Sequence, residues 1–164
     1  MVFRLLAAAI LLVFYGFYVF KLISQNRRSI KTNQAGIGNK PPKVLITEKI
    51  MSLANVLVIV ASVCSIFAVK NPPAAWVRII GLLTGVLAIA IFGLAVITMK
   101  TSWRVGIPEE KTELITSGIY QWSRNPAFVG FDLLYMSMCL LFFNIPLHVV
   151  SHWTAEILKN QKLQ

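Results

Sequence analysis

The chain has 164 residues, of which 57% are hydrophobic and only 13% are charged, and its mean hydropathy is +0.71. An ordinary soluble domain carries about 25% charged residues, so this composition excludes that class and indicates a protein embedded in a membrane. The net charge of +10 is typical of Lys and Arg in the cytoplasmic loops of membrane proteins. Because no basic stretch is interleaved with exposed aromatic residues, nucleic-acid binding is not expected.

Four apolar stretches follow one another along the chain, each close to the length of about 20 residues that a helix needs to cross a bilayer. The second and third are free of charged residues, whereas the first contains Lys21 near its end and the fourth contains Asp132. The predicted fold is all-α: a polytopic integral membrane protein with about four transmembrane helices in a single domain, residues 1–164. The predicted spans are residues 5–23, 50–69, 79–99 and 126–144.

The charges between these stretches predict how the helices cross the membrane. The loops at residues 24–49 and 100–125 are long and rich in Lys and Arg, whereas residues 70–78 carry only Lys70 and Arg78. Since Lys and Arg gather on the cytoplasmic side, we expect both long loops in the cytoplasm and the N-terminus outside. The first stretch lacks an A-x-A-like cleavage site and its basic cluster follows it, so a retained anchor is predicted and not a signal peptide.

The chain after Pro146 is too short for another span before its lysines begin. Its apolar residues recur at helical spacing, which predicts either an interfacial amphipathic helix or a truncated hairpin arm over residues 147–164. His148, His152 and Glu156 share a stripe of that helix. With no fourth ligand and no H-E-x-x-H order, the pattern does not predict a metal site.

The stretch "TSGIYQWSRNPAFVG", residues 116–130, stands where the second long loop meets the fourth span. Asn125 and Pro126 are typical of a helix start, and Arg124 beside Trp122 is typical of a membrane interface. These uses do not explain the Gly-Ile-Tyr triplet that precedes the arginine. Nor do they explain Asp132, because an ionisable residue inside a span marks a candidate functional site.

The pattern L-I-T-S-G-I-Y-x-x-S-R-N-P-A-F-V-G, residues 114–130, resembles a segment of the isoprenylcysteine carboxyl methyltransferases and related phospholipid methyltransferases. That segment reads L-V-x-x-G-I/P-Y-x-x-x-R-H/N-P-x-Y-x-G. We call residues 114–130 the motif segment. Residues 102–107, "SWRVGI", are similar to a tryptophan-containing stretch in many bacterial members. The matching positions are Gly118, Tyr120, Arg124, Asn125, Pro126 and Gly130, with Phe128 where the family often has tyrosine.

The resemblance implies an integral membrane enzyme that uses S-adenosylmethionine for methyl transfer. The acceptor would be a lipid-linked, prenylated or small hydrophobic molecule with a carboxylate, a thiol or an amine. The cofactor would bind at the cytoplasmic face, and the inner membrane of a bacterium is the expected location. Such an interfacial site suits a polar cofactor from the cytosol and an acceptor from the bilayer.

The same resemblance suggests roles for individual residues. Arg124 is the predicted catalytic residue, because its planar guanidinium suits a carboxylate of the cofactor or the acceptor. The backbone from Thr116 to Tyr120 would cradle the cofactor, and the helix that begins at Asn125 would add partial positive charge. The predicted cofactor-binding residues are Thr116, Gly118, Ile119, Tyr120, Arg124, Asn125, Pro126 and Phe128. Weaker candidates for the acceptor side are Trp103, Arg104 and Asp132.

The chain departs from the family pattern after its fourth span. Family members continue into an arm with E-E-x-x-L and F-G-x-x-Y, whereas residues 147–164 contain only Glu156 among acidic residues. The sequence therefore predicts a truncated or diverged arm and leaves alternatives open. One is a catalytically inert relative that acts as a binding or assembly protein, and another is a membrane reductase of the sterol-reductase kind. The oligomeric state is open.

Overall fold

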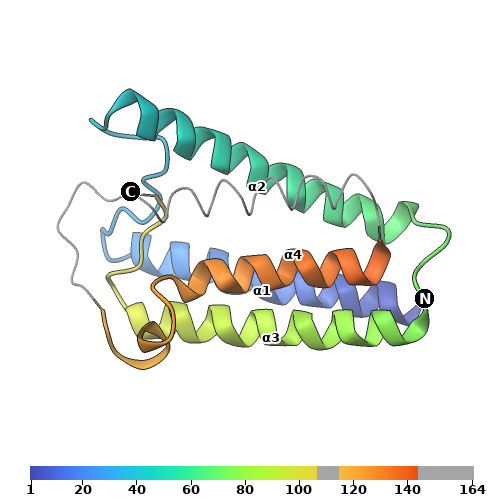
Figure 1. Ribbon diagram of the computed structural model, residues 1–164. Coiled ribbons are helices and arrows are strands. Elements are labelled where there is room, and N and C mark those ends of the chain that lie inside the picture. Colours follow the sequence, from blue (N-terminus) through green and yellow to red (C-terminus); the bar gives the residue numbers. More distant parts are fainter. Residues whose placement is uncertain (107–114, 144–164) are drawn as a thin grey trace.

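A computed structural model describes residues 1–106 and 115–143 of the chain. Its described residues form four α-helices and one short 3-10 helix, so the all-α prediction is confirmed for this part of the chain (Figure 1). The elements are α1 (Val2–Asn26), α2 (Pro42–Ala68), α3 (Ala75–Met99), η1 (Gly118–Gln121) and α4 (Pro126–Phe142). The helix predicted within residues 147–164 and the stripe of His148, His152 and Glu156 lie outside the described residues.

Helices α1, α2 and α3 are long and apolar enough to cross a membrane. Helix α4 is also apolar, but its 17 described residues make it shorter than these three. At 1.5 Å per residue, it extends for about 25 Å, somewhat less than the hydrocarbon core of about 30 Å. The chain is therefore an all-α integral membrane protein with about four helices.

Helices α1, α2 and α3 begin earlier than the apolar stretches that predicted them, whereas α4 begins at Pro126 as predicted. Helix α2 starts at Pro42, whereas the predicted span began at residue 50, so the first loop covers residues 27–41 and not residues 24–49. The prediction placed the boundary at the last charged residue, but charged side chains are compatible with the first turns of a helix. Pro42 at the first helical position has a backbone that suits the start of a helix.

The four helices run alternately up and down, so that α1 and α3 end where α2 and α4 begin (Figure 1). This end, which we call the loop end, carries the first loop and, from the loop after α3, residues 100–106 and 115–125. A parallel bridge between Asn33 and Val105 joins these two loops. The described parts of both long loops therefore lie at one end of the bundle (Figure 1), whereas the side of the membrane that they face stays a prediction.

Helices α3 and α4 form the closest pair in the bundle, and small residues allow this approach. A Cβ added to Gly130 would lie 2.9 Å from the Cβ of Phe92, and one added to Gly85 would lie 2.7 Å from the hydroxyl of Ser137. Ser137 donates a hydrogen bond of 2.6 Å to the carbonyl oxygen of Gly81. Small residues and hydroxyl groups of this kind are the usual means by which membrane helices pack.

An aromatic cluster fills the space between α1, α3 and α4. The rings of Phe14 and Phe92 are stacked with their centroids 4.5 Å apart, and Phe131 meets both rings edge-on. Edge-on and offset contacts of this kind stabilise a core beyond the area that they bury. The cluster therefore anchors the first turns of α4, which follow directly from the motif segment.

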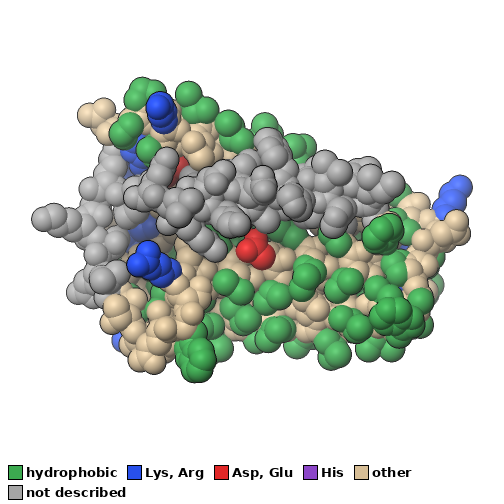
Figure 2. Space-filling view, in the orientation of Figure 1, with side chains coloured by type: hydrophobic (Ala, Val, Ile, Leu, Met, Phe, Trp, Pro, Cys, Tyr) green, Lys and Arg blue, Asp and Glu red, His purple; other side chains and the backbone are tan. Residues whose placement is uncertain are grey.

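Hydrophobic side chains cover the helices on the face shown in Figure 2, whereas Lys and Arg side chains gather towards the ends of the bundle. Many large hydrophobic residues of α1, α2 and α3 are exposed, among them Leu12 at 75% and Phe67 at 75%. In a soluble protein such exposure would be unfavourable, but in a bilayer these side chains contact lipid. This surface fits the membrane setting that the composition predicts.

Candidate functional site

The described part of the motif segment, residues 115–130, lies at the loop end and continues into the first turn of α4. Its Gly118 begins η1 with a φ of +61°, a left-handed conformation that glycine adopts without strain. A Cβ at this position would lie 3.4 Å from Cγ2 of Thr98, near the end of α3. The glycine is exposed, as are Thr116 and Ser117 before it. The sequence thus places an accessible backbone turn against α3, in the part of the motif expected to cradle a cofactor.

Tyr120, the next residue of the motif with a predicted role, is half-buried and packs against the hydrophobic core. Its hydroxyl group is buried and has no hydrogen-bond partner in the part of the chain that the structure describes. Burial raises the pKa of Tyr120 to about 12, so the hydroxyl remains protonated near neutral pH. A buried hydroxyl without a partner is unfavourable, and a polar ligand beside η1 would satisfy it.

Arg124 is exposed at the end of the turn that follows η1. Within residues 1–106 and 115–143, its guanidinium group makes no hydrogen bond and no ion pair. The side chain is therefore free to bind an anion from solution, and its fork of N–H donors suits a carboxylate. This freedom is compatible with the role predicted for it.

Asn125 and Pro126 occupy the N-cap and first position of α4, as their sequence predicts. The side chain of Asn125 makes no capping hydrogen bond. Its own backbone N–H instead donates to the hydroxyl oxygen of Ser123, 3.3 Å away. The positive end of the α4 dipole therefore lies one residue from the free guanidinium group of Arg124.

The apolar residues of the motif hold it against the bundle. Ile119 and Phe128 are partly buried and pack on the core formed by α1, α3 and α4. The backbone N–H groups of Trp122 and Ser123 both donate to the carbonyl oxygen of Ile119, which closes the turn. These contacts fix the backbone and leave Arg124 and Gly118 exposed.

The three candidates for the acceptor side lie in different surroundings. Trp103 is only 4% exposed and meets Tyr18 and Phe92 edge-on, so most of its surface is packed in the aromatic cluster. Nη1 of Arg104 donates to the carbonyl oxygens of Thr101 and Trp103, at 2.6 and 3.0 Å. Asp132 is half-buried in α4, in the second turn after Pro126. No direct contact between these three side chains and Arg124 is present among the described residues.

The first loop supports the start of the loop after α3 through backbone pairing. We call this loop, which is the third along the chain and the second of the two long ones, the third loop. The N–H of Gln34 donates to the carbonyl oxygen of Val105, and the N–H of Val105 donates to that of Thr32, each at 2.9 Å. This pairing gives a defined position to residues 103–106, which belong to the tryptophan-containing stretch. The sequence did not predict it, because pairing between residues so far apart leaves no local pattern.

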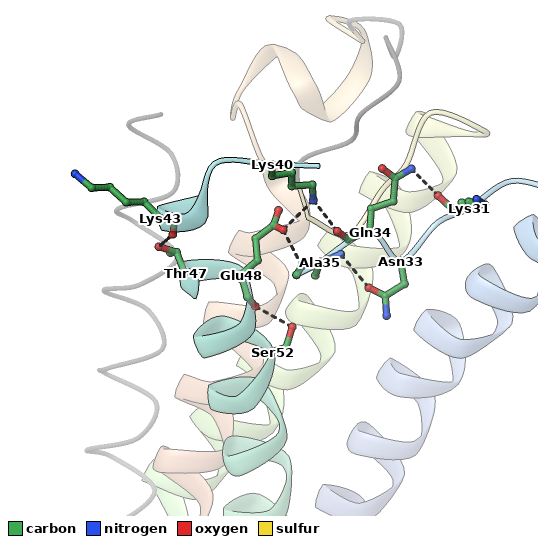
Figure 3. Close-up of polar contacts among 10 residues, drawn as sticks. Lys31, Asn33, Gln34, Ala35, Lys40, Lys43, Thr47, Glu48 and Ser52 are labelled. Carbon is green, nitrogen blue, oxygen red and sulfur yellow. Dashed lines mark hydrogen bonds and ion pairs between the residues drawn. The ribbon is translucent and has the colours of Figure 1, made fainter. Parts of the chain in front are cut away.

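A buried ion pair lies beside this pairing (Figure 3). The carboxylate of Glu48, in the second turn of α2, accepts hydrogen bonds from the N–H of Gly36 at 2.7 Å and from Lys40 Nζ at 2.8 Å. Lys40 Nζ also donates to the carbonyl oxygen of Gln34, 2.6 Å away. The exposed fractions of the two side chains are 6% for Lys40 and 0% for Glu48.

Sequence reasoning missed this pair, which fastens α2 to the first loop. One signal was present: Glu48 is the sole acidic residue before Glu109. A lone carboxylate at the edge of an apolar stretch is costly to bury without a partner, so it predicts a specific cation nearby. The sequence alone does not say which of several lysines provides it.

Helix α1 also contributes polar contacts to the loop end. Lys21 Nζ donates to the carbonyl oxygen of Val96 at 3.2 Å, and Nε2 of Gln25 donates to those of Lys100 and Thr101, both at 3.3 Å. The last carbonyl groups of a helix have no intrahelical partner, so these two side chains cap the end of α3. They thereby fix the point from which the third loop departs.

The chain matches a family model. The Isoprenylcysteine carboxyl methyltransferase (ICMT) family model aligns with residues 79–163, slightly more than half of the chain. The match contains α3 from residue 79 onward, the whole motif segment and α4, and it supports a membrane methyltransferase. No curated protein and no solved structure matches the chain.

Proposed function

Because this chain belongs to the isoprenylcysteine carboxyl methyltransferase family, we propose that it transfers a methyl group from S-adenosylmethionine to a lipid-linked or small hydrophobic acceptor. The acceptor presents a carboxylate, a thiol or an amine at the membrane interface. The reaction takes place at the loop end, which faces the cytoplasm in this proposal, and the membrane is the inner membrane of a bacterium.

The observation that carries this proposal is the state of Arg124. It lies in the family-matched region, it is exposed, and its guanidinium group is without a partner in the described part of the chain. A guanidinium group beside the N-terminus of a helix favours a carboxylate ligand. S-adenosylmethionine carries a carboxylate on its amino-acid part, and a carboxylate acceptor would supply another.

The described residues of the motif segment fit a polar cofactor. The buried hydroxyl of Tyr120 needs a hydrogen-bond partner, and the exposed backbone at Gly118 permits close approach because no side chain intervenes. Tyr120 and Phe128 also offer aromatic surface to an adenine ring or to a sulfonium. A cation beside an aromatic face is stabilised by the ring electrons.

The chemistry divides between the cofactor and the protein. When bound, S-adenosylmethionine would supply a methyl group on a sulfonium: the acceptor's nucleophile would bond to the methyl carbon while the carbon–sulfur bond breaks and the thioether leaves. In the protein, Arg124 holds an anionic group, the turn at η1 orients what it binds, and the apolar helices admit the acceptor from the bilayer. Positioning and exclusion of water of this kind lower the barrier of a displacement reaction without a strong base.

The direct test is titration of S-adenosylmethionine into the detergent-purified full chain. Wild type should bind, and Arg124→Ala should weaken binding by about 10-fold to 100-fold, the loss for a charge-assisted contact of about 1.5–3 kcal/mol. Arg27→Ala removes the same charge from an exposed residue of the first loop and should bind as wild type does. No binding by wild type, or equal binding by Arg124→Ala, would contradict the proposed site.

A methylation assay should follow with three acceptors side by side: a prenylcysteine, phosphatidylethanolamine and a small thiol. Transfer to one of them identifies the acceptor class. Binding of the cofactor without transfer to any of them would favour a catalytically inert relative that acts as a binding protein.

A further inference from the structure

A cleft of about 620 Å³ opens at the loop end, between the last turns of α1 and the first loop. Its apolar wall includes Ile23, Ile30 and Ile37, and its polar wall includes Asn26, Lys31 and Gln34. Its volume lies within the range of ligand pockets, about 300–1,000 Å³. Its lining residues all precede Asn39, so the cleft is separate from the motif segment.

Among the described residues that line the cleft, Lys31 is charged and none is acidic. The first 47 residues contain no acidic side chain, and the carboxylate of Glu48 is already paired with Lys40. Lys31 is exposed, and its ammonium group makes no hydrogen bond or ion pair with any residue that the structure describes. Arg27 and Arg28 are exposed at the end of α1 and add to the positive field. The cleft therefore favours an anion.

The backbone that carries Lys31 is held in place. Nε2 of Gln34 donates to the carbonyl oxygen of Lys31 at 3.0 Å (Figure 3). The same Gln34 donates its backbone N–H to Val105 and accepts from Lys40 Nζ through its carbonyl oxygen. The position of the lysine beside the cleft is thus fixed by contacts with the third loop and, through Lys40, with α2.

The cleft combines apolar and cationic surface at the level where α1 leaves the membrane. Ile23 is 50% exposed and Ile37 is 64% exposed, so both present apolar surface that water does not favour. A soluble anion would leave these side chains uncovered, whereas an acyl chain would cover them. Basic pockets next to membrane helices bind the head groups of anionic lipids by the same combination.

We propose that this cleft binds an anionic phospholipid of the surrounding bilayer. Lys31 contacts the phosphate of the head group, the amide of Asn26 donates a hydrogen bond to one of its oxygens, and the part of an acyl chain nearest the head group lies along Ile23, Ile30 and Ile37. The site is independent of the methyl transfer proposed above, because it uses none of the residues that hold the cofactor.

The experiment measures lipid binding to the full chain in detergent by native mass spectrometry, with no cofactor present. Dioleoyl-phosphatidylglycerol should bind about fivefold more tightly than dioleoyl-phosphatidylcholine, since each basic side chain near a lipid surface contributes about 1 kcal/mol. Lys31→Gln should abolish this preference. Lys43→Gln loses the same charge from a side chain on the far side of the Lys40–Glu48 ion pair (Figure 3), and it should retain the preference.

A second pair of variants tests the apolar wall. Ile37→Ser should weaken the binding of phosphatidylglycerol about threefold through lost apolar contact. Ile46→Ser changes a side chain of α2 that is exposed to a similar extent, 58%, but does not line the cleft, and it should bind as wild type does. Both isoleucines are exposed, so neither change removes a core contact.

Several results would overturn the proposal. Equal binding of the two lipids would mean that the cleft has no preference for an anionic head group. An equal loss of that preference in Lys31→Gln and Lys43→Gln would mean that a basic surface in general, and not this cleft, attracts the lipid. Displacement of the lipid by inorganic phosphate would identify a site for soluble anions. Displacement by a prenylcysteine would identify the cleft as part of the acceptor site.

Discussion

Gly106 in the third loop and Ala35 in the first loop lie in direct backbone contact. A Cβ added to Gly106 would lie 2.7 Å from the Cα of Ala35 and 3.0 Å from Oε1 of Glu48. The glycine also has a φ of +86°. No other residue type satisfies both conditions without strain, so the junction of the two loops depends on this position.

Gly106→Ala should therefore destabilise the folded protein by about 1–3 kcal/mol, through the steric contact and the left-handed backbone. Gly93→Ala is the matched control, because a Cβ at this position of α3 has no heavy atom within 4 Å, and alanine favours a helix. Thermal unfolding in detergent measures both. A Gly106→Ala protein with the melting temperature of wild type would contradict the contact.

The buried pair of Lys40 and Glu48 should show strong coupling. Glu48→Gln leaves the ammonium group of Lys40, 6% exposed, without its counter-ion. We expect the free energy of unfolding to fall by about 3–5 kcal/mol. Lys40→Met should cost a similar amount. The double variant should lose much less than the sum of the two, because no charge remains buried. Additive losses in denaturant unfolding would show that the two side chains do not interact.

Gln25 should stabilise the junction between α1 and the third loop. Its side chain is 2% exposed, accepts a hydrogen bond of 2.7 Å from the hydroxyl of Thr32, and donates to the carbonyl oxygens at the end of α3. Gln25→Leu should lower the free energy of unfolding by about 1–3 kcal/mol, because the hydroxyl of Thr32 and the carbonyl oxygens at the end of α3 lose their hydrogen-bond partner. Gln121→Leu, on an exposed residue of η1, is the control. Equal unfolding free energies for the two variants would exclude this role.

Tyr120 should contribute a dependence of stability on alkaline pH. Burial raises the pKa of its hydroxyl to about 12, whereas an unfolded tyrosine titrates near about 10. Between these values the folded protein keeps a proton that the unfolded chain has lost. The contribution of the Tyr120 hydroxyl to the stability of the fold is therefore complete below about pH 10 and is lost as the pH rises through about 12.

Tyr120→Phe should reduce the loss of stability over this alkaline range and leave stability at neutral pH nearly unchanged, since the hydroxyl has no partner in the described part of the chain. The unfolding free energy of both proteins, measured from neutral to alkaline pH, checks this. Identical pH profiles would mean that the hydroxyl is not buried in solution.

The spans could be predicted from the sequence because hydropathy reports the hydrocarbon environment directly. Their limits were less accurate: α2 begins at Pro42, eight residues before the predicted span. The polar first turns of α2 lie outside the apolar stretch but inside the helix. The shared end of the two long loops followed from the alternation of the helices.

The candidate site was predicted in part. A local motif identified Gly118 and Arg124, and the structure finds both exposed at the loop end. The contacts that support the site involve partners far apart in sequence, such as Asn33 and Val105, and a single sequence carries no record of them. The helix start at Asn125 and Pro126 is confirmed, although residue preference indicates a helix start without determining which hydrogen bond forms there.

The bridge between Asn33 and Val105 sets an order for biogenesis. When the ribosome has made the first loop, Val105 has not yet been synthesised, because α2 and α3 lie between the two residues in the chain. Until then, the backbone N–H of Gln34 and the carbonyl oxygen of Thr32 have no partner from the third loop. The pairing that supports the site is therefore completed only after α3 has been made.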